Sequence, residues 1–79
     1  MPPPAGPRTP ALVEITCDGV LPRADREEFD GWDVRVSRRT TVLTGRGVDQ
    51  AALHGALDRL ARLGLHVVEV RRAPRESGR

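Results

Sequence analysis

The sequence predicts an α+β domain of the ferredoxin-like class, with element order β-α-β-β-α-β and a four-stranded, mainly antiparallel sheet. Three observations lead to this prediction. Residues 40–72 have the pattern of a strand, a turn, a capped helix and a further strand. Residues 11–17 and 32–37 alternate apolar and polar side chains, as half-buried strands do. This order predicts two interlocked β-α-β units, with the strands arranged in space as four, one, three, two.

The first predicted strand is residues 11–17 (ALVEITC), with Val13, Ile15 and Cys17 facing the core. Residues 1–10 (MPPPAGPRTP) are Pro-rich and without periodicity, and we expect a disordered tail there. Residues 73–79 are expected to be a second disordered tail. The folded part is then a single domain of residues 11–72, whose small core favours oligomerisation.

The segment Pro22–Asp30 has two interpretations, a helix of about two turns or an ordered loop. A strand follows at residues 32–37, with Trp32, Val34 and Val36 facing inward. Arg38 and Arg39 then form a tight connection to a strand at residues 40–44, which ends at Gly45.

The helix that follows has an N-cap at Asp49, whose carboxylate can accept from first-turn N–H groups. Its apolar face is formed by Leu53, Ala56, Leu57 and Leu60. Gly64 can adopt a left-handed conformation and end the helix, which lets Leu65 fold back onto Leu60. Residues 66–71 (HVVEVR) form the last strand.

Gly55 lies in the middle of this helix, where glycine costs about 1 kcal/mol relative to alanine. One interpretation is a close approach of the helix to the sheet. The other is a flat contact spot for a second subunit.

The face of the sheet away from the helix has a mixed character. Glu14 and Glu69 can pair with Arg35 and Arg71 across neighbouring strands. Leu12 and Val67 are predicted to form a small apolar island among these charges. Such a face is either solvated or a dimer interface.

The residue types needed for catalysis or metal binding are present only singly. Cys17 is the one cysteine and can form no internal disulfide. His54 and Asp58 have helical i,i+4 spacing, which indicates a surface polar pair. Cys17 is expected on a different face from His54, so no nucleophile–base pair is predicted. We therefore predict no enzyme, no metal and no cofactor.

An anion site is the alternative function. Gly45, Arg46 and Gly47 precede the predicted helix start, where backbone N–H groups can bind anions, but the Walker and dinucleotide patterns are absent. A nucleic-acid surface is disfavoured, because Phe29 and Trp32 are the only aromatic residues available to stack on bases.

The length and composition restrict the location of the protein. No apolar run is long enough to span a bilayer, and no signal-peptide pattern is present. All basic residues are arginines and acidic residues are interleaved with them, which leaves a formal net charge of +2. A cytoplasmic protein without membrane contact is expected.

Residues 40–70 (TTVLTGRGVDQAALHGALDRLARLGLHVVEV) resemble a group of short actinobacterial proteins with the pattern TTxLTGxxxDQAALHGLLxxxxxLGLxLxxV. The match is most specific from Leu43 to Gly45 and from Asp49 to Gly55. The group often has Pro at the position of Arg46. The resemblance implies a fold and no activity, and it singles out Gln50, His54 and Gly55 as a possible contact patch.

Together these features predict a non-enzymatic protein–protein interaction or regulatory module, either a homodimer or a small subunit of an assembly. Its contacts are expected through Leu12 and Val67 on the open sheet face, or through Gln50, His54 and Gly55 on the helix. The alternative is a small-ligand or anion sensor that uses residues 45–47 and the helix start.

Overall fold

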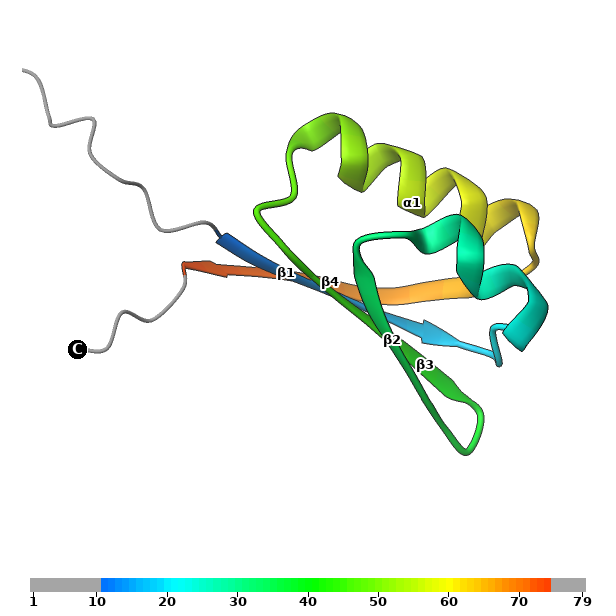
Figure 1. The fold of residues 1–79 in the computed structure, drawn as a ribbon. Helices are drawn as coiled ribbons and strands as arrows, with labels where there is room; N and C mark the ends of the chain where they lie inside the picture. The colour runs from blue at the N-terminus through cyan, green and yellow to red at the C-terminus, as the bar shows by residue number, and fades with distance from the viewer. Residues whose placement is uncertain (1–10, 75–79) are drawn as a thin grey trace, which may run out of the picture.

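The computed structural model describes residues 11–74. Its elements are β1 (Ala11–Asp18), a 3-10 helix η1 (Arg23–Phe29), β2 (Trp32–Ser37), β3 (Thr40–Arg46), α1 (Gln50–Arg62) and β4 (His66–Pro74). The strands form one antiparallel sheet in the order β2-β3-β1-β4, and α1 and η1 lie on the same side of it (Figure 1). The predicted α+β class is confirmed. Counted from the β4 edge, the strand order is four, one, three, two, as expected from the sequence.

The ends of the folded part differ slightly from the prediction. β4 continues to Pro74, because residues 73 and 74 pair with Leu12 and Ala11 of β1. The predicted tail from residue 73 was therefore wrong for these two residues. The tails predicted at residues 1–10 and at 75–79 lie outside the described residues.

The segment between β1 and β2 adopts the short helical alternative, as a 3-10 helix. It begins with Asp25 N donating to the Pro22 carbonyl at 2.9 Å. Phe29 at its end and Leu21 before it are buried, with 2% and 0% exposure. These two side chains fix the segment on the core, because the rest of it carries few apolar groups.

The core lies between the sheet and the helical layer. Its strand residues include Val13, Ile15, Cys17 and Leu43, and its helix residues are Leu53, Ala56 and Leu60. Leu57, Leu63, Trp32 and Val34 pack against it in half-buried positions. The predicted inward faces of the helix and of β1 are confirmed.

Both ends of α1 are held as the sequence predicts. The Asp49 Oδ1 accepts from the Ala52 N–H at 2.8 Å. At the other end Gly64 has φ +86°, and the Leu65 N–H donates to the Leu60 carbonyl at 3.0 Å. This left-handed ending places Leu65 in the core beside the last turn.

The β2–β3 hairpin closes through Arg38 and Arg39, with Ser37 opposite Thr40. Arg38 has φ +58° and is the one non-glycine residue with a positive φ in the described part of the chain. β3 continues to Arg46 instead of ending at Gly45, because Gly45 pairs with both Val13 and Trp32 and Arg46 pairs with Leu12.

A buried threonine ties the connection after β1 to the sheet. Thr41 of β3 has 0% exposure. Its hydroxyl donates to the Gly19 carbonyl at 2.7 Å and accepts from the Leu21 N–H at 3.0 Å. One side chain thereby satisfies two backbone groups of a loop that lies twenty or more residues away.

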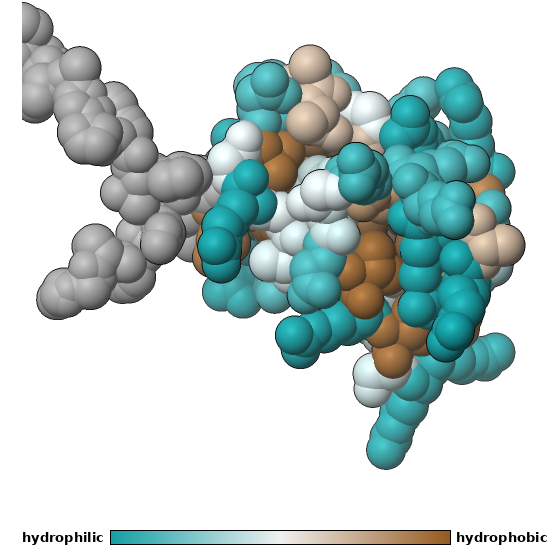
Figure 2. Space-filling model, in the orientation of Figure 1, coloured by the Kyte–Doolittle hydropathy of each residue, from teal (hydrophilic) through white to brown (hydrophobic). Residues whose placement is uncertain are grey.

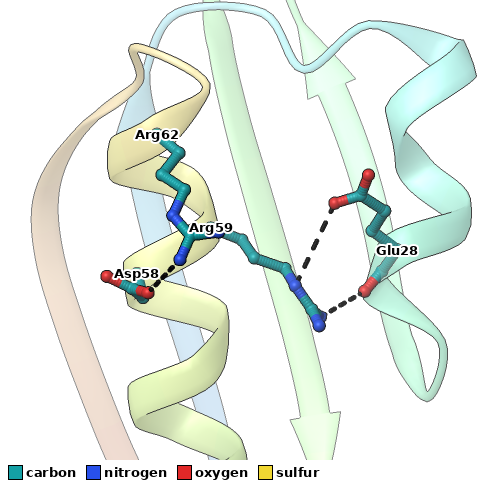
Figure 3. A network of polar contacts seen from close by, with 4 residues as sticks. All are labelled: Glu28, Asp58, Arg59 and Arg62. Carbon is teal, nitrogen blue, oxygen red and sulfur yellow. Dashed lines mark hydrogen bonds and ion pairs between the residues drawn. The ribbon is translucent and has the colours of Figure 1, made fainter.

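η1 and α1 are connected by a second polar contact (Figure 3). Arg59 Nη1 donates to the Glu28 carbonyl at 2.8 Å, and its Nε lies 4.0 Å from the Glu28 carboxylate. One turn further, Arg62 pairs with Asp58 at 3.1 Å. The exposed contact of Arg59 with Glu28 thus joins the two helical elements above the sheet, whereas the pair of Arg62 and Asp58 lies within α1.

Candidate interaction surface at strand β4

Strand β4 is an edge strand that pairs with β1 on one side only. All its side chains from residue 66 to 72 are exposed. An edge strand presents a row of backbone N–H and C=O groups that can pair with another strand. The described part of the sheet has two edge strands, β2 with six residues and β4 with nine. β4 therefore presents the longer row of backbone groups.

A β-bulge interrupts the regular pairing of β4. Thr16 lies opposite Glu69, whereas its neighbour Cys17 lies opposite Val67, so Val68 is an extra residue. Residues directly opposite in an antiparallel pair share a face of the sheet. Val67 therefore lies on the helix side with Cys17, and the prediction of Val67 on the open face was wrong. Strict alternation along the strand would put Val67 on the same face as Glu69, but the extra residue Val68 moves Val67 to the other face.

The helix-side valines of β4 are only partly covered. Val67 and Val70 have 39% and 41% exposure, whereas Ile15, opposite Val70 in β1, has 0%. Val68 at the bulge has 66%. Figure 2 draws a different face, on which β2 and η1 lie in front of β4, and hydrophobic residues emerge there between hydrophilic ones around the helical layer. The core thus continues to the β4 edge and remains open to solvent there.

The open face of β4 carries charges of both signs. Arg71 lies opposite Glu14, with 4.0 Å between Nη1 and Oε1, and its Nε lies 3.9 Å from the Glu69 carboxylate. The predicted pairing of Arg71 is confirmed. The predicted pairing of Arg35 with these acids was wrong, because β3 separates β2 from β1, and Arg35 pairs with Asp33 at 3.3 Å.

The other predicted contact residues lie on two different surfaces. Gln50, His54 and Gly55 are exposed on α1. His54 and Gly55 line an open groove together with Leu57, Asp58 and Ala61. Leu12 lies half-buried on the opposite, open face of the sheet, beside Glu14, Thr44 and Arg71. The structure therefore does not bring the helix residues together with Leu12.

The glycine in the middle of α1 does not serve a close approach to the sheet. A Cβ added at Gly55 meets no atom within 4 Å, and the residue is exposed. The interpretation of Gly55 as a helix–sheet contact was therefore wrong. Its position in the groove of α1 leaves the contact-spot interpretation as a prediction.

The turn before α1 offers a poor surrounding for an anion. Arg46 is exposed at the end of β3. The first turn of the helix is already capped by the Asp49 carboxylate. A negative charge at this position opposes the binding of a second one, so the geometry gives the anion-sensing alternative no support.

Cys17 and His54 are held in different environments. Cys17 is fully buried in the core, and burial raises the pKa of its thiol by desolvating the thiolate. His54 is exposed on α1, and the carboxylate of Asp58 pairs with Arg62. Within residues 11–74, no group of three or more His, Cys, Asp or Glu residues is arranged to hold a metal ion.

The raised pKa of Cys17 predicts a loss of stability at alkaline pH. The thiol ionises in the unfolded chain above about pH 8.5, and its raised pKa keeps it protonated to a higher pH in the fold. The stability it contributes is therefore complete below that pH, and it falls as the pH rises, by at most about 1.4 kcal/mol per unit. The sequence contains no Lys or Tyr that would titrate in this range. Urea unfolding from pH 8 upward measures the slope, and Cys17→Val should flatten it. An equal slope in both proteins would contradict this assignment.

Comparison with known proteins gives one match. A family model described as Domain of unknown function (DUF8691) matches residues 12–71, which includes β2, β3, both helical elements and most of β1 and β4. No curated protein and no solved structure matches the chain significantly. Among the described residues, no helix has the length and apolar character required to cross a membrane.

Proposed function

The chain belongs to the DUF8691 family, and from this premise we propose that it is a non-enzymatic protein–protein interaction module that recognises an extended strand at its β4 edge. The observation that carries the proposal is the exposure of Val67 and Val70, 39% and 41%, on the side of the sheet that the helices cover. A strand added beside β4 would pair its free backbone groups and cover these valines. A minimal ferredoxin-like fold, with a 3-10 helix in the first crossover, is part of the proposal. Its support is the antiparallel order β4-β1-β3-β2.

We also propose that the protein is cytoplasmic and has no catalytic activity. The free cysteine is buried rather than presented to a substrate. The surface charges pair with one another near β4. We place the module in the cytoplasm, where an unpaired cysteine remains reduced.

Substitution of Val70 by lysine tests whether the β4 edge binds another strand. An inward-pointing charge on an edge strand opposes the addition of another strand. Val70→Lys should weaken self-association, or the binding of a fluorescent peptide of the β4 sequence HVVEVRRAP, by roughly ten-fold or more. Analytical ultracentrifugation and fluorescence anisotropy measure the two.

Val20→Lys is the matched control. Val20 has 49% exposure and lies outside β4, in the connection after β1. It should leave both measurements unchanged. Wild-type protein that stays monomeric at high micromolar concentration and also ignores the peptide would refute the proposal.

A further inference from the structure

We propose that the strand bound at the β4 edge is β4 of a second copy of this chain, paired antiparallel about a two-fold axis through Val70. This inference rests on the proposed function and names its partner. The proposed pairing joins two four-stranded sheets into one continuous sheet of eight strands, with the helical layers of both copies on the same side.

The pleat of the sheet limits the registers that such a pair can adopt. Residues directly opposite in an antiparallel pair face the same side. An axis between two consecutive residues would place opposite one another two side chains that face different sides. The axis must therefore pass through a single residue. Beyond the bulge at Val68, the regular part of β4 offers four centres whose side chains are described, Glu69, Val70, Arg71 and Arg72.

The four registers differ in which charged residues they place directly opposite one another. An axis through Glu69 places two glutamates directly opposite, and axes through Arg71 or Arg72 place two arginines opposite, which is destabilising in each case. An axis through Val70 places Glu69 opposite Arg71 of the second copy, and does so twice by symmetry. It is the one register of the four that opposes no like charges at its centre and pairs opposite charges on both sides of it.

In the register centred on Val70, the side chains of the second copy extend rows of side chains that already run across the neighbouring strands on both faces of the sheet. On the open face, Glu14 lies opposite Arg71 within one copy, and Glu69 of the second copy extends the row with alternating sign. On the helix side, Leu43, Ile15 and Val70 form a cross-strand row. Val70 of the second copy extends this row and covers the side chain that the single chain leaves 41% exposed.

Disulfide trapping tests the register. In a Cys17→Ser background, Val70→Cys places the two thiols at directly opposite positions, where Cα atoms lie about 4.5–5.5 Å apart, within the range of a disulfide. Mild oxidation should convert this variant to a covalent dimer. Val68→Cys is the matched control on the same strand and is more exposed, at 66%. Its two copies would lie about 13 Å apart, too far for a disulfide.

A charge exchange provides an independent test. Glu69→Arg and Arg71→Glu should each raise the dimer dissociation constant roughly ten-fold, because each places like charges opposite. The double exchange should restore it to within a few-fold. Thermal unfolding of each variant confirms that it folds.

The outcomes separate this inference from the proposed function. A dimer that cross-links through Val68→Cys but not Val70→Cys overturns the register and leaves edge pairing intact. A monomer that still binds the β4 peptide overturns the second-copy partner alone. Failure of both association and peptide binding overturns the proposed function as well.

Discussion

Replacing Thr41 with valine is expected to lower the free energy of unfolding by about 2–4 kcal/mol, because two backbone groups lose their partner at once. The Thr41 hydroxyl bonds the Gly19 carbonyl at 2.7 Å and the Leu21 N–H at 3.0 Å. Valine keeps the shape of threonine and replaces its hydroxyl with a methyl group, which can neither donate nor accept a hydrogen bond. Each group left without a hydrogen bond costs about 1–3 kcal/mol where water cannot replace it. Urea unfolding followed by circular dichroism measures the difference.

Thr41→Ser is the control for this prediction. Serine keeps the hydroxyl and loses one methyl group, so a cost of about 1 kcal/mol is expected. The prediction concerns the order of the two variants. A valine variant as stable as wild type, or a serine variant less stable than the valine variant, would show that Thr41 acts by packing and not by hydrogen bonding.

Gly45→Ala is the second substitution with a large expected effect, a loss of about 2–3 kcal/mol from overpacking. A Cβ at this position would lie 2.6 Å from Val48 Cγ2 and 2.9 Å from Trp32 Cε3. Gly45 is buried between strands β1 and β2, and Val48 and Trp32 both pack against the core, so the added Cβ would force these side chains to shift. Thermal and urea unfolding measure the loss.

Gly55→Ala provides a matched glycine-to-alanine change with the opposite sign. The added Cβ meets nothing within 4 Å, and alanine is the better helix former. An increase in stability of about 0.5–1 kcal/mol is expected. Equal effects of the two substitutions would contradict the packing assigned to Gly45. A loss of self-association in Gly55→Ala would indicate that the groove of α1 also takes part.

The local signals in the sequence predicted the parts of the fold that depend on local contacts. Asp49 caps α1 through a first-turn N–H, and Gly64 ends it with a positive φ. Both features are set by residues within one helical turn of each other. Alternation likewise identified the inward face of β1, because the period of two follows directly from the pleat.

The features that the sequence did not reveal depend on contacts distant along the chain. The bulge at Val68 reverses the face of Val67, and it exists only through the pairing of β4 with β1. The sequence does not distinguish Thr41 from an ordinary strand residue, because its hydrogen-bond partners lie twenty and twenty-two residues away. The tight packing of Gly45 arises partly from the nearby Val48 and partly from Trp32 on a neighbouring strand, and only the second contact is distant along the chain. The candidate surface at the β4 edge was accordingly predicted in part, with Val67 included but assigned to the opposite face.

Amide hydrogen exchange in β4 tests the central claim most directly. Within residues 11–74 of a single chain, no other strand pairs with the amides of β4 that do not bond to β1, so we expect these amides to exchange rapidly at low micromolar concentration. If β4 takes up a second strand, their exchange should slow as the concentration of the chain rises toward millimolar, and Val70→Lys should abolish the slowing. Rapid exchange of these amides at every concentration, with the β1-bonded amides protected throughout, would contradict a second strand at this edge.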